Sequence, residues 1–101
     1  MLSLQSFLFT LLNIEEDKEV SVHCQGTTYN ISDIVYSTKE GISIICDKEE
    51  KSIYTLQKLV NTLHYFSLLK PINVKIDNKP YNIHAITYNN GKRLSLNVEE
   101  I

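Results

Sequence analysis

An eight-residue pattern that occurs twice constrains the fold of this chain more than any other feature. Tyr-Asn-Ile-x-x-Ile-x-Tyr runs from Tyr29 to Tyr36 and again from Tyr81 to Tyr88, a shift of 52 positions. With this shift, residues 1–49 and 53–101 align without gaps and are identical at 12 of 49 positions. Self-similarity of this kind is typical of internal duplication. We therefore expect a single compact domain, residues 1–101, made of two pseudo-symmetric repeats, 1–49 and 53–101, joined by the linker 50–52.

Each repeat carries the pattern of a helix followed by three strands. Apolar residues at three- and four-residue spacing predict amphipathic helices from Leu4 to Leu12 and from Leu56 to about Phe66, with Ser3 and Ser52 as N-caps. Alternating apolar residues then predict strands around 20–24, 29–36 and 42–46, and around 72–76, 81–88 and 94–98. The expected fold class is α+β, a tandem duplication of an α-β-β-β unit with antiparallel three-stranded meanders each covered by one helix. Whether the six strands form one sheet or two stays open.

The repeated pattern interrupts the two-residue period of a strand. Ile31 and Ile34 are three residues apart, so both can point inward only if the strand contains an extra residue. This predicts a β-bulge at Ser32-Asp33 and another at His84-Ala85. The tyrosines of the pattern are then expected to point inward. The expected inner pairs are Cys24 with Tyr29, Val22 with Ile31, Tyr36 with Ile42, and Ile34 with Ile44.

Charge divides the chain into two unlike halves. Residues 1–52 carry 4 basic and 9 acidic side chains, and residues 53–101 carry 6 basic and 3 acidic ones, for a net charge of −2. Overall acidity without a dense basic run argues against nucleic-acid binding. The apolar segment Met1–Leu12 lacks a basic flank and is short for a bilayer span. It also aligns with residues 53–64 in mid-chain, so we expect a core helix in a cytoplasmic protein that has no membrane partner.

No group of residues points to a reaction. Cys24 and Cys46 flank the central strand of the first repeat and should stand roughly 9–10 Å apart, too far for a disulfide, so we expect buried free thiols. None of the three histidines recurs in the other repeat, and none has metal-ligand spacing with a partner. The glycines are isolated, which excludes a phosphate-binding loop. We therefore expect no metal, no cofactor and no enzymatic activity.

Our leading hypothesis is a non-enzymatic protein-binding module that uses the positions where the repeats differ. Acidic loops of the first repeat would attract a basic partner. Val35 and Ile45 form a small apolar spot on the outer face, where the second repeat has Thr87 and Asn97. The predicted partner-binding residues are Glu15, Glu16, Asp17, His23, Val35, Ile45, Glu49 and Glu50.

Two alternatives stay open beside this hypothesis. The first is an oligomer that sequesters a small ligand or nucleotide, with sites at the junction between repeats or subunits. Its positive charge would come from Lys70, Lys75, Lys79, Lys92 and Arg93. The second is a structural or assembly role in a virion. For the leading hypothesis, the expected protein partner is a host protein or a second copy of this chain.

The helix-then-sheet order resembles a class of known proteins. It is carried by helix Leu56–Leu63, Val74, Tyr81-Asn82-Ile83 and Ile86. This outline is similar to the small accessory proteins of phages, including inhibitors of CRISPR nucleases, although the duplication departs from those single-unit proteins. The resemblance implies an inhibitor of a host defence protein, acting in the host cytoplasm. It transfers no functional residue to this sequence.

Overall fold

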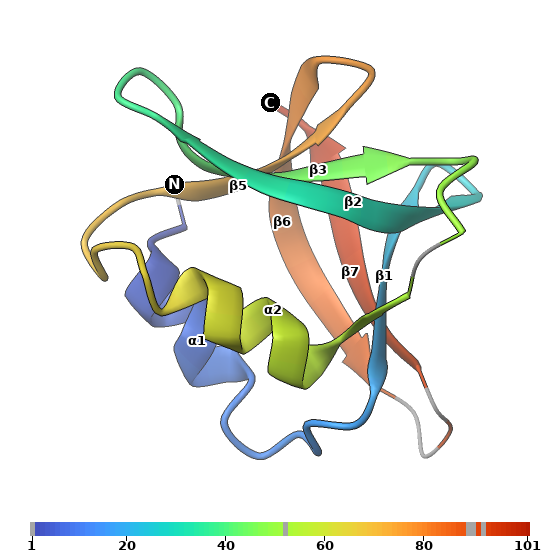
Figure 1. Ribbon diagram of the computed structural model, residues 1–101. Coiled ribbons are helices and arrows are strands. Elements are labelled where there is room, and N and C mark those ends of the chain that lie inside the picture. Colours follow the sequence, from blue (N-terminus) through green and yellow to red (C-terminus); the bar gives the residue numbers. More distant parts are fainter. Residues whose placement is uncertain (1, 52, 89–90, 92) are drawn as a thin grey trace.

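The computed structural model describes residues 2–51, 53–88, 91 and 93–101 (Figure 1). Its elements follow in the order α1 (Leu4–Thr10), β1 (Glu19–Cys24), β2 (Thr27–Ser37), β3 (Gly41–Asp47), β4 (Tyr54–Thr55), α2 (Leu56–Leu63), β5 (Ile72–Ile76), β6 (Lys79–Tyr88) and β7 (Arg93–Glu100). The succession of one helix and three strands in each half agrees with the sequence patterns. The two-residue strand β4 is additional.

The strands form one closed barrel, not two meanders. Within each half the strands pair antiparallel, and two parallel pairings, β3 with β5 and β7 with β1, join the halves into a six-stranded mixed barrel. The prediction of an α+β fold, a tandem of antiparallel three-stranded meanders each covered by one helix, is therefore wrong. The physical reason lies in the strand edges. An isolated meander leaves unpaired N–H and C=O groups on both outer strands, and closure satisfies them.

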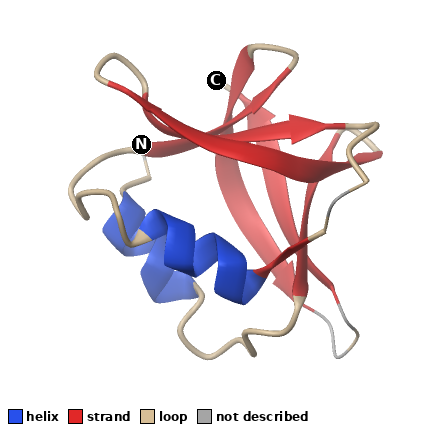
Figure 2. Ribbon diagram, in the orientation of Figure 1, coloured by secondary structure: helices blue, strands red, loops and turns tan. Residues whose placement is uncertain are grey.

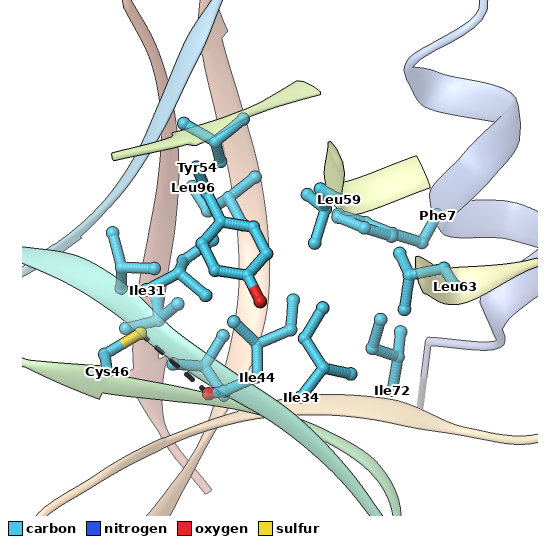
Figure 3. Packing of buried hydrophobic residues seen from close by; sticks show 14 of the residues in the cluster. Phe7, Ile31, Ile34, Ile44, Cys46, Tyr54, Leu59, Leu63, Ile72 and Leu96 are labelled. Carbon is cyan, nitrogen blue, oxygen red and sulfur yellow. Dashed lines mark hydrogen bonds between the residues drawn. The ribbon is translucent and has the colours of Figure 1, made fainter. Parts of the chain in front are cut away.

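Both helices lie together on one side of the barrel (Figure 2). Figure 3 shows Phe7 of α1 and Leu59 of α2 pointing toward the barrel interior, and both side chains are fully buried. Each helix begins on a segment from the other half of the chain. The amide of Leu4 donates to the carbonyl of Lys70 and the amide of Leu56 to the carbonyl of Lys18, both at 2.8 Å. The two halves are thus interlocked through their helices as well as their strands.

The ends of the helices agree only partly with the sequence patterns. Ser3 is the N-cap of α1, as predicted, and its Oγ accepts from the amide of Ser6 at 3.1 Å. The N-cap of α2 is Thr55, so the prediction for Ser52, which lies outside the described residues, is wrong. Thr55 still pairs with Glu19 as part of β4, so the helix cannot begin earlier. The helix also ends at Leu63 and does not reach Phe66, whose ring turns onto the barrel.

Both predicted β-bulges are confirmed. The β2–β3 register shifts between Ile31 and Asp33, and the β6–β7 register shifts between Ile83 and Ala85. The predicted pairs Ile34–Ile44 and Tyr36–Ile42 are also confirmed.

The first hairpin is tighter than predicted. Val22 lies opposite Tyr29, and not opposite Ile31, because Gln25 and Gly26 form a two-residue turn with φ of 50° and 81°. In the second half Val74 pairs with Tyr81, which is the same pairing displaced by 52 residues. The described strand registers therefore follow the sequence shift, while the origin of that shift in a duplication stays a prediction.

The core contains both cysteines and one of the repeated tyrosines. Cys24 and Cys46 are free and buried, as predicted, and burial raises the pKa of the Cys46 thiol to about 12. Tyr81 is buried, but Tyr36 and Tyr88 are 40% and 37% exposed. Tyr36 lies opposite the buried Ile42, so it keeps the predicted inward face of its strand, but both tyrosines lie at the rim of the barrel and stay partly exposed.

Gly41, which opens β3, provides a test of the junction between the halves. Its φ is +78°, and an added Cβ would lie 2.5 Å from the carbonyl oxygen of Pro71, which accepts from the amide of Ile42. We expect Gly41→Ala to lower the free energy of unfolding by about 2–3 kcal/mol, measured by urea denaturation. Gly26→Ala is the matched control, because its φ is +81° but nothing lies within 4 Å of the added carbon. It should cost about 1 kcal/mol. Equal losses in the two variants would contradict the close approach of Pro71.

Candidate partner-binding grooves

An apolar groove separates α1 from β6. It has a volume of about 340 Å³, and we call it the β6 groove. Its lining residues are Leu2, Thr10, Ile14, Ile83, His84, Ala85, Ile86 and Tyr88. The bulge at Ile83–Ala85 bends β6 at this point, so this stretch of the strand lines the groove.

A second apolar groove runs between the two helices. It has a volume of about 260 Å³, and we call it the interhelical groove. Its lining residues are Leu8, Leu11, Leu12, Ile14, Glu16, Leu56, Val60 and His64. Ile14 lines both grooves, so the two are neighbours on either side of the end of α1.

The end of α1 explains why apolar groups are exposed here. After the helix, the amide of Ile14 donates to the carbonyl of Leu11 at 3.2 Å, and this turn directs the chain back toward the helix. Leu12 lies on the turn with 70% of its surface exposed, and Phe9 on the outer side of α1 is 74% exposed. Exposed apolar side chains that border apolar grooves are a common mark of an interaction surface.

Negative charge follows directly after Ile14 in the chain. Glu15, Glu16 and Asp17 are all exposed, and Glu16 also lines the interhelical groove. Lys18 offsets part of this charge, because its Nζ lies 3.5 Å from the Glu15 carboxylate. The backbone of the acidic loop is held in place, since the carbonyl of Glu16 accepts from the amide of Gln57 at 2.9 Å. One end of the grooves is therefore acidic.

Few polar groups line the grooves. His84 and Tyr88 are the titratable residues of the β6 groove, and Glu16 and His64 are those of the interhelical groove. Among the described residues, no group of three or more His, Cys, Asp or Glu side chains could hold a metal ion. The grooves offer apolar contact area with a few polar groups at the rim, a composition that suits a side chain of another molecule.

A larger depression of about 620 Å³ lies over the outer face of α2. It is lined by Thr55, Gln57, Lys58, Asn61, Thr62, His64 and Tyr65. Most of these residues are polar and exposed, and they lie on the convex outer side of a helix. A large volume above such a surface is open solvent, so we consider the two apolar grooves the better candidates.

The structure divides the sequence-predicted partner residues among separate places. Only Glu15, Glu16 and Asp17 adjoin the grooves. Glu49 and Glu50 lie in the loop after β3, where the carbonyl of Glu50 accepts from Asn30 at 2.7 Å.

The remaining predicted residues lie on β2 (Val35) and on its two neighbours, β1 (His23) and β3 (Ile45). Ile45 is opposite Asp33, with Val35 as its diagonal neighbour, whereas His23 is opposite Thr28. Asp33 and Thr28, the β2 residues opposite Ile45 and His23, are five residues apart, which is roughly 17 Å along the strand. The structure therefore does not bring the eight residues into one surface, and their role in binding stays a prediction.

The cations of the alternative ligand site are also separated. Three of these cations form ion pairs with separate carboxylates: Lys75 with Glu40 at 2.5 Å, Lys79 with Glu100 at 2.6 Å and Arg93 with Glu19 at 3.7 Å. Lys79, the first residue of β6, pairs with Glu100 at the end of β7, whereas Arg93 begins β7, so the two cations are separated by the length of that strand. Lys70 lies 5.8 Å from the Tyr36 ring, and Lys92 is outside the described residues. The four described cations do not gather at one place.

Comparison with known proteins adds no relative. No protein-family model, no curated protein and no solved structure matches this sequence. In the part of the chain that the structure describes, no helix is long and apolar enough to cross a membrane.

Sequence reasoning missed the residues that leave the β6 groove open. Three lining residues are smaller than their counterparts 52 positions away: Leu2 aligns with Tyr54, Ile14 with Phe66 and Ala85 with Asp33. The signal was therefore present in the alignment of the repeats. It could be read only with the knowledge that these three positions face one another across a helix and a strand.

Proposed function

We propose that this protein is a non-enzymatic protein-binding module that holds an apolar segment of a partner in the two grooves beside α1. The observation that carries the proposal is that the β6 groove and the interhelical groove meet at Ile14. Together they provide two neighbouring places for apolar side chains on one short segment. Apolar anchors seated in preformed pockets supply most of the binding energy in protein interfaces.

The acidic loop favours a partner segment with basic residues. Glu15, Glu16 and Asp17 follow the groove residue Ile14, and Lys18 offsets part of this charge through its ion pair with Glu15. Opposite charge at the rim of an interface chiefly raises the association rate and selects among partners. That the partner is a host protein, inhibited by a phage-encoded chain, stays a proposal.

Selection from a random peptide library tests this function. We expect library peptides of about 12 residues that bind the protein to be rich in apolar and basic residues, with affinities measured by isothermal titration. Leu12→Lys and Ala85→Lys place a charge in the interhelical and β6 grooves at exposed positions. Each should weaken binding at least about tenfold, because a buried or repelled charge costs about 1.4 kcal/mol or more.

Val35→Lys is the matched control. Val35 is an exposed apolar residue on the outer side of β2, away from both grooves, and it belongs to the sequence-predicted surface. Peptide affinity should not change in this variant. Peptides that lose affinity in Val35→Lys but not in the groove variants would place binding on the outer sheet face. A library that yields no binding peptide would reject the proposed function.

A further inference from the structure

The two halves of the chain differ in what lies against the second tyrosine of the repeated pattern, Tyr36 in the first half and Tyr88 in the second. In the first half, Phe66 stacks on Tyr36, with ring centroids 6.0 Å apart and an interplanar angle of 23°. The positions 52 residues away are Ile14 and Tyr88 in the second half. Among the residues that the structure describes, no aromatic ring stacks on Tyr88, and Ile14 and Tyr88 instead line the β6 groove. The first half therefore shows how a ring occupies this place, and the second half leaves it open.

A second pair of aligned positions enlarges the difference. Tyr54 is 8% exposed, and Figure 3 shows its ring pointing into the core. Its counterpart Leu2 is smaller and lines the β6 groove. Burial, and secondly the carboxylate of Asp33, raise the pKa of Tyr54. The counterpart of Asp33 is Ala85, so at this position the groove carries a methyl group and no charge.

Strands β2 and β6 have the same register in the two halves, but other residues bury β2 more completely than β6. Ile31 and Ile34, on either side of the first bulge, pair with β3. Ile83 and Ile86, on either side of the second bulge, pair with β7 in the same register. Ile31 and Ile34 are buried, at 0% and 9% exposure, whereas Ile83 and Ile86 are only partly buried. Since the strand geometry is the same, the exposed surface of Ile83 and Ile86 comes from the smaller residues opposite them. An incoming apolar group would cover it.

We propose that the β6 groove receives one aromatic side chain from a partner segment, stacked on Tyr88 as Phe66 is stacked on Tyr36. This inference rests on the proposed protein-binding function and specifies its anchor residue. Aromatic rings are frequent anchors because they bury a large area with few rotatable bonds. Basic residues beside the ring would face Glu15, Glu16 and Asp17, which follow the groove residue Ile14. The occupant is thus an aromatic residue with a basic neighbour.

The subsite is tested with a small probe by NMR. We expect N-acetyl-phenylalaninamide, titrated to millimolar concentration, to shift the amide resonances of residues 83–88. N-acetyl-leucinamide should bind at least about fivefold more weakly, because it cannot stack on Tyr88. Equal shifts with the two probes, or shifts located elsewhere, would overturn the aromatic subsite.

Two variants make the test specific. Ile14→Phe supplies the ring that the first half already has and should abolish the shifts at residues 83–88. Tyr88→Leu keeps an apolar wall but removes the stacking partner, so it should weaken the phenylalanine probe about fivefold and leave the leucine probe unchanged. Tyr88 is 37% exposed, so this variant should fold even if Ile14→Phe does not. A Tyr88→Leu protein that binds both probes as before would refute the stacking.

The selected peptides separate this inference from the function on which it rests. Replacing the aromatic residue of a binding peptide by leucine should lower its affinity at least about tenfold. Peptides that bind in the grooves and tolerate this replacement would keep the protein-binding function and overturn the aromatic anchor. If no peptide binds but the phenylalanine probe still shifts residues 83–88, the aromatic subsite stands and the protein-binding function fails.

Discussion

Residues 1–50 and residues 53–101, produced as separate chains, are each expected to be unfolded as monomers. Each half alone would lack two parallel strand pairings, β1 with β7 and β3 with β5. It would also lack the backbone carbonyl that accepts a hydrogen bond from the first amide of its helix. This carbonyl belongs to Lys70 for α1 and to Lys18 for α2. A chain of about 50 residues buries too little surface to offset these losses. The expected loss is therefore the whole free energy of unfolding, about 5–15 kcal/mol for a domain of this size.

Circular dichroism and light scattering check this result. Each half should give a disordered spectrum as a monomer, and an equimolar mixture should recover the spectrum and the size of the intact protein. The intact chain cut between Lys48 and Glu49, which are exposed and follow the end of β3, is the control, and it should stay folded because no barrel pairing is broken. A half that unfolds cooperatively as a monomer would contradict the interlocked barrel. A half that folds only as a dimer would agree with it, because a second copy can supply the missing edges.

Phe7→Ala should have the largest effect of the single substitutions. Phe7 is fully buried and projects from α1 into the barrel beside the α2 residues Leu59 and Leu63 (Figure 3). Truncating a buried phenylalanine removes apolar contact and leaves a cavity that the surroundings fill only partly. We expect a loss of about 3–5 kcal/mol, which lowers Tm by more than about 10 °C in a domain of about 100 residues.

Phe9→Ala is the matched control, on the same helix and with the same atoms removed. Phe9 is 74% exposed, so its truncation should change stability by less than about 0.5 kcal/mol. Thermal unfolding followed by circular dichroism measures both variants under one set of conditions. Similar Tm values for the two variants would show that α1 does not close the core through Phe7.

Local patterns predicted the elements and their inward faces. The apolar spacing in residues 4–11 and 56–63 marked both helices, and both bulges followed from the three-residue interval between isoleucines. The pairs Ile34–Ile44 and Tyr36–Ile42 followed as well, because a bulge and a short hairpin leave little choice of register. These features depend on residues that are near one another in the chain.

The candidate site was predicted only at its acidic edge. Glu15, Glu16 and Asp17 were chosen for their charge, which can be read from any stretch of sequence. The apolar part of the site joins Leu2, Ile14 and β6, which are far apart in the chain. A groove depends on the space left between side chains from different elements, and no periodicity contains that information.

The sequence by itself determined two helices, six strands with inward apolar faces and two bulges, because backbone sterics and alternation act over a few residues. Only the tertiary structure decided that parallel pairings close the strands into one barrel and that each helix begins on the other half. An alternating strand shows which face is buried but not which distant edge it will meet. The open groove beside Tyr88 has the same origin, since closure brings β6 against α1 and the segments that flank it, where Leu2, Ile14 and Ala85 are too small to fill the space between them.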